Sequence, residues 1–448
     1  MKWALYNILF LFVYPFLLPG FLIRMLRRGG YAARMGDRIA LYHESLMKEF
    51  AAGRASGGFV WIHAVSVGEV QVAGRLMKEW RKVEPDVRFC FSTTSSTGWR
   101  TAEKEVAERD VLIYNPLDFP TFVKAALLTV CPRAIVLTES EIWPNFIRRA
   151  AKMRIPLFLV NARVSDRSAP RYKAARIFFG DVFRCFKKIF AQSDLDAARI
   201  RATYGCGASL AVGGDNISVT GSFKFDAAVR NEAKEKELKS WIFGDGVSPA
   251  AKILLGGSTW PGEDEVLLGI YKEILSSGGN VLLVIAPRHF EKADAVEANI
   301  VAAGFKCIRR SRGERGGDAK GGAVFLADTT GELMGRYGIA DAVFVGKSLC
   351  AHGSQNMIEP CLCGKPTFVG PYTENFRPVM SDLLASNAIV QVKDAAELKA
   401  RLVAMFGSGA AANEAEALGE RACNAVERRR GVVAKCVSET RAAICGRG

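Results

Sequence analysis

The amino-acid sequence predicts an α/β protein with two doubly wound parallel-sheet domains. From Phe59 onward, short apolar runs rich in β-branched and aromatic residues alternate with segments of helical pattern. The runs are almost uninterrupted in apolar character, which is typical of parallel strands covered by helices on both faces. A lysine-rich polar stretch, Arg230–Ser240, divides the alternation into two series. The 448 residues also exceed what one hydrophobic core usually holds.

The composition indicates a globular protein with anionic partners. Apolar residues make up 49% and charged residues 24% of the chain, and 61 Lys and Arg outweigh 46 Asp and Glu for a net charge of +15. The basic residues are spread out without interleaved aromatic or RNP-type motifs, which argues against nucleic acid. The eleven Cys are scattered, and only Cys361 and Cys363 stand close together. We therefore expect reduced thiols, no metal site and no cofactor.

The N-terminus predicts an uncleaved membrane anchor over residues 1–26. Trp3–Ile23 is almost continuously apolar and long enough to cross a hydrocarbon core, and arginines follow it from Arg24 to Arg38. Those arginines are expected to keep the remaining chain on the cytoplasmic side of the membrane, next to anionic lipids. Because Pro15 and Pro19 interrupt the run, a helix lying in the interface is the alternative. A cleaved signal peptide fits less well, since no small-residue cleavage site precedes the basic residues.

The first domain is expected over residues 27–228. Helices are predicted at Glu69–Trp80, Thr97–Arg109 and Ser193–Tyr204, among others. The predicted strands are Val60–Val65, Val87–Thr93, Val111–Tyr114, Ala134–Thr138, Leu157–Val160, Lys188–Ala191 and Ile217–Thr220.

The second domain is expected over residues 229–448. Arg309–Gly322 is predicted as a solvated loop, and about the last 35 residues as a helix with a basic end. The predicted strands are Ile253–Leu255, Val281–Ile285, Ala323–Leu326, Ala342–Val345, Thr367–Val369 and Ile389–Val392.

Gly346–Pro360 is the most suggestive stretch of the chain. It follows a predicted strand and leads into a helix expected to begin at Asn356. A glycine-containing turn and a helix start bind anions through free backbone N–H groups and the helix dipole. Asn356 and Glu359 share one face of the first turn, where a carboxylate suits a ribose diol. An ordinary turn capped by Asn356 is the alternative.

Other polar residues also follow predicted strands, where parallel sheets bind their ligands. Glu69, after His63, is a candidate general base or a helix-start acid that favours the dipole. Ser258 can donate to a phosphate, and Arg288 can bind a phosphate or carboxylate. No GxGxxG follows the first strand and no GxxxxGK[ST] is present, which argues against a dinucleotide oxidoreductase and a P-loop ATPase. Further strand ends carry Thr138–Asn145, Thr220–Asp226 and Asp328–Glu332.

Taken together, these motifs resemble the Kdo transferases of lipopolysaccharide assembly. The matching segments read SVGE, TESEIWPN, NARVSDRS, TGSFKFD, APRHFEK, DTTGEL and NMIEP, and they cover nearly the whole chain. The resemblance implies a membrane-anchored glycosyltransferase of GT-B fold, with two Rossmann-like domains facing a cleft. It implies transfer of 3-deoxy-D-manno-octulosonic acid (Kdo) from CMP-Kdo to the lipid A precursor lipid IVA by a single inverting displacement.

The resemblance also implies roles for individual residues. Glu69 would accept the proton of the lipid hydroxyl, and Glu139 or its neighbour Glu141, with Lys224, would stabilise the transition state. Ser258, at the end of its strand, is also expected to contact the donor. The other residues expected to hold the donor are Pro287, Arg288, Thr330, Gly331, Glu332, Asn356, Met357, Ile358 and Glu359.

The family usually reads GGS and then GGHN where this chain has Gly346-Lys347-Ser348 and Gly353-Ser354-Gln355-Asn356. Lys347 stands where the family usually has glycine, and Gln355 replaces a histidine, so no role of that histidine is assigned to it. Two other functions compete with Kdo transfer. One is a GT-B enzyme that transfers a UDP-sugar to a lipid or cell-wall precursor. The other is a non-catalytic, membrane-tethered binder, which leaves the polar strand ends unexplained.

Overall fold

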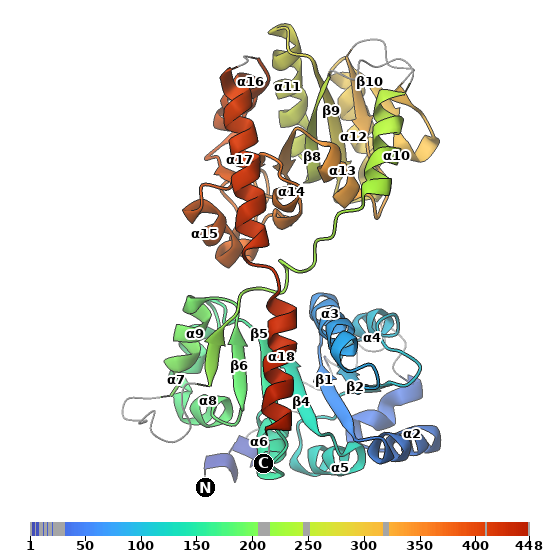
Figure 1. The fold of residues 1–448 in the computed structure, drawn as a ribbon, viewed down its shortest axis with the longest axis vertical. Helices are drawn as coiled ribbons and strands as arrows, with labels where there is room; N and C mark the ends of the chain where they lie inside the picture. Colours follow the sequence, from blue (N-terminus) through green and yellow to red (C-terminus); the bar gives the residue numbers. More distant parts are fainter. Residues whose placement is uncertain are drawn as a thin grey trace. The chain divides into compact units, whose positions relative to one another are not determined.

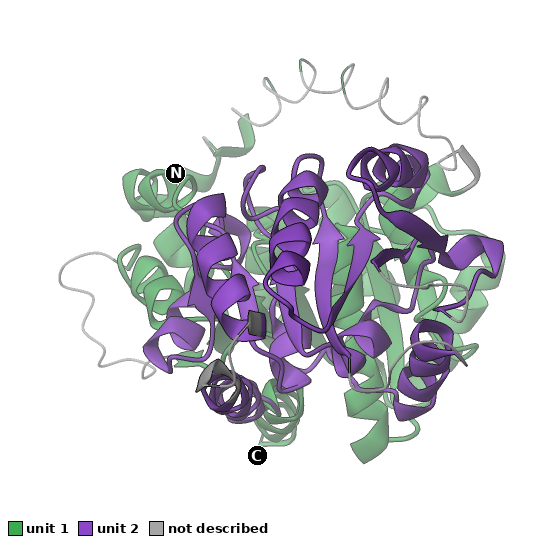
Figure 2. Ribbon diagram, turned by 90° about the horizontal axis from the view of Figure 1, so that it is seen from above, with its two compact units in different colours: residues 1–223, 431–448 green, residues 224–430 purple. Residues whose placement is uncertain are grey.

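The computed structural model describes residues 2–4, 6–8, 12, 16, 20, 32–204, 216–244, 251–316, 322–407 and 410–446 (Figure 1). The chain divides into two compact units, coloured separately in Figure 2. Unit 1 comprises Met1–Phe223 and Gly431–Gly448, and unit 2 comprises Lys224–Arg430.

Unit 1 contains a seven-stranded parallel sheet in the order β3-β2-β1-β4-β5-β6-β7. The order reverses between β1 and β4, so the loops that follow these two strands diverge at this switch point. The strands are β1 Phe59–His63, β2 Arg88–Thr93, β3 Val111–Tyr114, β4 Ala134–Thr138, β5 Leu157–Ala162, β6 Lys188–Ala191 and β7 Ile217–Val219.

Helices cover both faces of this sheet because alternate residues of each strand are apolar on opposite sides. In β1, Phe59 and Trp61 pack with α2, α5 and α6, whereas Val60 and Ile62 pack with α3 and α18. The helical segments are η1 Ala32–Ile39, α2 Glu44–Ala55, α3 Val67–Val83, α4 Ser96–Ala102, α5 Pro120–Val130, α6 Pro144–Lys152, α7 Ala169–Ala174, α8 Arg176–Phe183, α9 Asp194–Arg201 and α18 Val432–Cys445.

Unit 2 repeats this arrangement in the order β10-β11-β9-β8-β12-β13-β14, again fully parallel. Its order reverses between β8 and β12. The strands are β8 Lys252–Thr259, β9 Val281–Pro287, β10 Lys306–Arg309, β11 Ala323–Leu326, β12 Ala342–Val345, β13 Thr367–Val369 and β14 Val390–Gln391.

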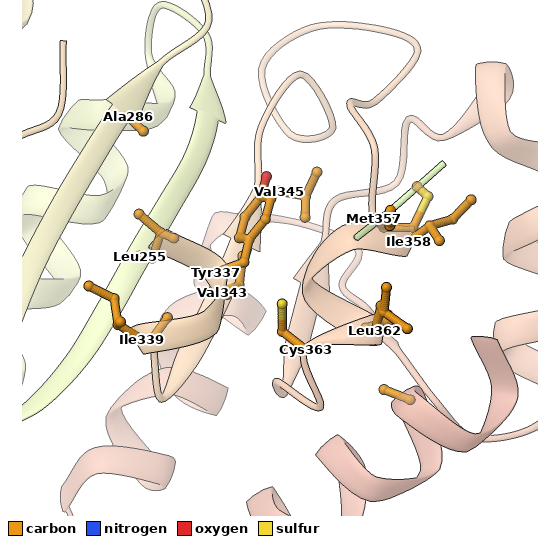
Figure 3. Close-up of a cluster of buried hydrophobic side chains, with 14 of the residues drawn as sticks. Leu255, Ala286, Tyr337, Ile339, Val343, Val345, Met357, Ile358, Leu362 and Cys363 are labelled. Atoms are coloured by element: carbon orange, nitrogen blue, oxygen red, sulfur yellow. The ribbon is translucent and has the colours of Figure 1, made fainter. Parts of the chain in front are cut away.

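The two faces of the second sheet also form separate cores. Leu255, Val343 and Val345 pack with α13 and α14 in the cluster of Figure 3, and Leu254 and Phe344 pack on the opposite face with α11 and α16. The helical segments are α10 Glu232–Phe243, α11 Glu263–Ser276, η2 Phe290–Lys292, α12 Ala293–Ala302, η3 Arg310–Arg312, α13 Leu333–Ile339, α14 Ile358–Leu362, η5 Glu374–Phe376, α15 Arg377–Ala385, α16 Ala395–Gly407 and α17 Ala410–Glu427.

The limits of the units differ from the predicted domains. The sequence places the boundary after residue 228 and all later residues in one domain, whereas unit 2 begins at Lys224 and ends at Arg430. Gly431, with φ of 83°, separates α17 from α18, and α18 packs on α3 of unit 1. Val432 and Val433 are buried there, which explains the return of the C-terminus.

Several elements also differ from prediction. The expected solvated loop Arg309–Gly322 begins within the edge strand β10, whose pairing with β11 was missed. The helix expected at Thr97–Arg109 ends at Ala102. The helix expected to begin at Asn356 begins at Ile358 and has five residues, with Pro360 in its first turn.

Most of the predicted anchor, Trp3–Ile23, lies outside the described residues. Within the described part of the chain, no helix is both long and apolar enough to cross a membrane. Two residues at the N-terminus contact α8: the Trp3 ring meets Phe178 edge-on at 5.4 Å, and the Lys2 ammonium lies 2.7 Å from the Asp181 carboxylate. The structure gives the predicted anchor no support.

A buried carboxylate holds the start of α6, the helix that begins within the TESEIWPN segment. Asp118 is 3% exposed, and its two oxygens accept hydrogen bonds from the amides of Asn145 at 3.0 Å and Phe146 at 2.8 Å. Burial raises the pKa of Asp118 to about 7, although both amides counteract the rise. The folded unit therefore binds a proton at Asp118 more readily than the unfolded chain.

This carboxylate predicts a pH-dependent stability. Between pH 4 and 7 the folded state holds more protons at Asp118 than the unfolded state, so the unfolding free energy falls as pH rises, by at most about 1.4 kcal/mol per pH unit. Asp118→Asn lowers stability by misplacing one acceptor, but removes this slope. Urea unfolding at a series of pH values measures how the unfolding free energy depends on pH. Asp86→Asn, at an exposed position, is the control. Equal slopes for wild type and Asp118→Asn would contradict the assignment.

Candidate active site

The carboxyl end of β1 carries the first candidate residues. His63 ends the strand, and Ser66 caps α3 because its Oγ accepts a hydrogen bond of 3.3 Å from the Glu69 amide. The Glu69 carboxylate folds back in return, and its Oε2 accepts from the amides of Val65 at 2.7 Å and Ser66 at 3.2 Å. This reciprocal capping box fixes the position of Glu69.

Glu69 is a capping residue that uses only one of its two carboxylate oxygens in the cap. The residue is 8% exposed, and within the described part of the chain Oε1 has no hydrogen-bond donor. Burial raises the pKa of Glu69, the charge of Glu141 raises it further, and the amides of Val65 and Ser66 oppose the rise. The helix-start interpretation is therefore compatible with the general-base prediction, because the cap occupies only Oε2.

Glu141 lies beside His63, across the switch point from Glu69. His63 is fully buried, with Nδ1 2.9 Å from Oγ of Ser92 and Nε2 3.6 Å from Oε2 of Glu141. The same carboxylate oxygen accepts a hydrogen bond of 3.0 Å from the Trp143 indole. The structure thus brings together Glu69 and Glu141, two of the predicted residues, and adds His63, to which the sequence assigned no role.

Glu139 points to a different neighbour. It follows β4 in the left-handed conformation, with φ of 51°, and its Oε1 accepts a hydrogen bond of 3.1 Å from the Asn161 side-chain amide. The Asn161 Oδ1 in turn accepts from the Phe223 amide at 3.1 Å. Glu139 is therefore connected to the segment before Lys224, whereas Glu141 is connected to His63.

Lys224 is the first residue of unit 2. Its ammonium lies 4.1 Å from the ring centroid of Phe376, in cation–π geometry. This contact positions the predicted cation within its own unit.

In unit 2 the switch point is formed by the turn after β8 and the loop after β12. Ser258 and Lys347 both have positive φ, of 54° and 57°, and the Lys347 ammonium lies 4.6 Å from the Trp260 ring centroid. The Trp260 Nε1 is buried and has no partner among the described residues. The cation and the indole donor suit an anionic ligand.

The prediction that backbone N–H groups of Gly346–Pro360 are free for an anion is wrong for its first half. The amides of Lys347, Ser348, Leu349 and Cys350 all donate to the carboxylate of Glu263. An acid of the protein itself already occupies this anion site. The sequence offered no signal for it beyond an acid in a helix's first turn.

Arg288 follows β9 and is well placed to bind an anion. Its amide donates to the Thr259 carbonyl at 3.0 Å, which fixes the backbone next to β8. The side chain is exposed, and among the described residues it has no ion-pair partner. Pro287 precedes it as the last residue of β9 and lines a cavity of about 80 Å³ with Trp260 and His289.

Glu332 is engaged in an internal ion cluster. It accepts hydrogen bonds from Thr329 and Arg336, both at 2.6 Å, and pairs with Arg310 and Lys234. Burial raises the pKa of Glu332, but the hydrogen bonds from Arg310, Lys234 and Thr329 lower it to about 2. The neighbouring turn, Thr330 and Gly331, is exposed. Glu332 thus shapes this turn from inside.

Of the predicted donor residues 356–359, two are buried in the core and two are only partly buried. Met357 and Ile358 are fully buried in the cluster of Figure 3, so only their backbone is available to a ligand. The Asn356 side-chain amide donates to Oε1 of Glu359 at 2.9 Å, and its Oδ1 accepts from the Ile358 amide at 3.2 Å. Asn356 therefore orients the Glu359 carboxylate.

Comparison with solved structures supports the architecture. A crystal structure of a glycosyltransferase from Rickettsia africae superposes with a TM-score of 0.55 at 13% identity, over 87% of this chain and all of that chain. The likeness extends across both units and confirms the predicted pair of parallel-sheet α/β domains.

Comparison of sequences identifies the family. A family model described as 3-deoxy-D-manno-octulosonic-acid transferase (kdotransferase) matches residues 33–227. The chain is 31% identical over 346 residues to a 3-deoxy-D-manno-octulosonic acid transferase of Haemophilus influenzae, spanning 77% of this chain and 78% of that protein. It is 32% identical over 344 residues to its counterpart from Bordetella pertussis, spanning 75% and 76%. The resemblance found in the motifs is confirmed, and the chain belongs to the 3-deoxy-D-manno-octulosonic acid transferase family of glycosyltransferases.

Proposed function

We propose that this protein transfers Kdo from CMP-Kdo to a lipid A precursor, lipid IVA, with inversion at the anomeric carbon. The observation that carries the proposal is the buried Glu69 carboxylate, fixed by its capping box and raised in pKa beside Glu141. A carboxylate with a raised pKa is suited to proton transfer near neutral pH.

The acceptor chemistry is assigned to unit 1. Oε1 of Glu69 takes the proton of the lipid hydroxyl while the hydroxyl oxygen forms a bond to the anomeric carbon. The bond from that carbon to the phosphate oxygen breaks, and CMP leaves with the electron pair. Lys224, the first residue of unit 2, is assigned to the negative charge that develops on the leaving phosphate. Glu141 and Glu139 are both kept as candidates for stabilising the positive charge on the sugar.

The donor is assigned to unit 2. Arg288 is exposed and unpaired in the described part of the chain, so its guanidinium is available to the phosphate. Glu359, oriented by Asn356, is assigned to the ribose hydroxyls. The exposed Thr330–Gly331 turn and the backbone of Met357 and Ile358 complete this assignment, while Glu332 acts through the ion cluster behind the turn.

We further propose that residues 1–26 hold the protein at the inner membrane, with both units in the cytoplasm and near anionic lipids. The apolar run and the following arginines support this proposal. Phe12 and Phe16 are 68% and 85% exposed, so they offer apolar surface to a bilayer.

Glu69→Gln tests the general base. Glutamine also serves in a capping box, so the substitution keeps the start of α3 and removes basicity. Turnover of lipid IVA should fall about 10²- to 10⁴-fold, while CMP affinity stays unchanged. Glu79→Gln on the same helix, measured by the same mass-spectrometric assay, should retain the wild-type rate. Near-normal turnover by Glu69→Gln would leave Glu69 as a capping residue only.

Arg288→Ala and Glu359→Ala test the donor site. Each loses a charge-assisted hydrogen bond worth roughly 1.5–3 kcal/mol, so CMP affinity should fall about ten- to a hundredfold. Calorimetric titration measures this, with Arg401→Ala on α16 as the control for lost charge. UDP serves as the competing ligand. If UDP binds the wild type as tightly as CMP does, the donor assignment is wrong.

Phe12→Glu combined with Phe16→Glu tests the anchor while keeping the contacts of Lys2 and Trp3 with α8. A charge in hydrocarbon costs roughly 2.5–3.5 kcal/mol, so the doubly substituted protein should leave the membrane fraction. Its turnover of detergent-dispersed acceptor should match the wild type. Co-sedimentation with vesicles containing anionic lipid measures partitioning. Unchanged sedimentation would contradict anchoring through this segment.

A further inference from the structure

Glu263, the first residue of α11, is a buried acid with an unusually complete set of donors. It has no exposed surface. Its Oε2 accepts hydrogen bonds of 2.8 Å from the amides of both Trp260 and Lys347. Its Oε1 accepts from the amides of Ser348 at 3.1 Å, Leu349 at 3.0 Å and Cys350 at 3.4 Å. Five backbone donors thus surround one carboxylate.

This number of donors matters because a buried carboxylate is costly unless hydrogen bonds replace its hydration. Bonds between ionised acceptors and backbone N–H groups are among the stronger ones in proteins. An acid that served only the helix dipole would need no contact with another loop. Four of the five donors to Glu263 come from residues 84 to 87 positions later in the chain. The carboxylate is therefore a cross-link between two distant loops.

The two loops follow β8 and β12, the strands between which the order of the second sheet reverses. Parallel sheets of this kind bind their ligands at such a point. The first loop carries Trp260, and the second carries Lys347, whose ammonium lies over the Trp260 ring. Glu263 holds the backbone of both partners of this contact, since both amides donate to its Oε2.

The second loop is closed on itself around the same point. The Ser354 amide donates to the Lys347 carbonyl at 2.7 Å, and the Gln355 amide donates to the Gly346 carbonyl at 3.1 Å. A Cβ on Gly346 would lie 2.3 Å from the Ser258 carbonyl oxygen, so the loop also abuts the end of β8. The next residue, Asn356, orients Glu359. A displacement at residues 347–350 is thereby passed to the donor residues.

We propose that Glu263 is a positioning residue for the donor: its carboxylate fixes the Lys347–Cys350 backbone, and through it Lys347 and the Asn356–Glu359 pair. The inference rests on the proposed function, because it assumes that unit 2 binds CMP-Kdo. Glu263 itself contacts no ligand, since its oxygens are occupied by the five amides.

The test compares Glu263→Gln, Glu263→Asp and Glu273→Gln. Glutamine keeps the size but sets an NH₂ group against the loop amides. Aspartate keeps the charge with a shorter reach. Glu273 lies on the same helix and pairs with Lys399 at the surface, so its substitution removes a carboxylate without touching the loop. Steady-state kinetics with CMP-Kdo and lipid IVA are measured beside hydrogen–deuterium exchange of residues 347–350.

For Glu263→Gln we expect the KM for CMP-Kdo to rise about ten- to a hundredfold, with kcat and the KM for the acceptor near wild type. The amides of residues 347–350 should exchange faster. Glu263→Asp should give a donor KM and an amide exchange rate between those of the wild type and Glu263→Gln. Glu273→Gln should match the wild type. If Glu263→Gln fails to fold, Glu263→Asp against Glu273→Gln provides the same comparison.

Two results would overturn the inference. One is an unchanged KM for CMP-Kdo in Glu263→Gln. The other is a loss of kcat and of acceptor binding as large as the loss of donor binding, because a general loss of structure would produce that result. A wild-type protein that does not use CMP-Kdo would refute the proposed function instead. Amide exchange without ligand would then decide alone whether Glu263 holds the loop.

Discussion

The candidate site depends on how backbone N–H groups are satisfied where a parallel sheet reverses its strand order. The two loops at such a point diverge, so their amides lack the regular partners of a strand or helix. In both units a glutamate from the first turn of the following helix supplies the acceptor. Glu69 accepts from two amides at its own loop, and Glu263 accepts from five amides drawn from two loops. The two first-turn glutamates therefore differ in how many of their oxygens the loop amides occupy. In the described part of the chain, Glu69 uses one carboxylate oxygen, whereas both oxygens of Glu263 accept hydrogen bonds.

The charged residues of unit 2 follow a similar division. Arg309, Arg310 and Arg336 are all bound by Asp328 or Glu332, so they stabilise the turn after β11 and do not present their charge outward. Arg288 has no such partner in the described part of the chain. A net charge of +15 says little about where ligands bind, because many cations are neutralised locally. An unpaired cation at a strand end, such as Arg288, is more informative than the net charge.

The sequence was sufficient for the sheets, because buried parallel strands are continuous apolar runs. The sequence did not predict β10, because Lys306–Arg309 has a charged residue at each end and lacks a continuous apolar run. This strand lies at the edge of the second sheet. In the site, the strand-end position of Glu69 and Arg288 was predictable, whereas the burial of Met357 and Ile358 was not. The role of Glu263 was also hidden, because a first-turn acid looks the same whether it faces solvent or receives a distant loop.

Backbone strain gives the same picture of where the fold is most constrained. Nine described residues other than glycine have positive φ, and four of them lie at carboxyl ends of strands beside the candidate site: Glu139, Asn161, Ser258 and Lys347. Each such conformation costs of order 1 kcal/mol or more and persists only where neighbours enforce it. Glu139 and Asn161 are bound to one another, and Lys347 is bound to Glu263. Glycine would adopt these angles at no steric cost, so each of these side chains adds a local conformational penalty. Hydrogen bonds thus hold the strained backbone at three of these four strand ends: the side chains of Glu139 and Asn161 bind each other, and the amide of Lys347 binds Glu263.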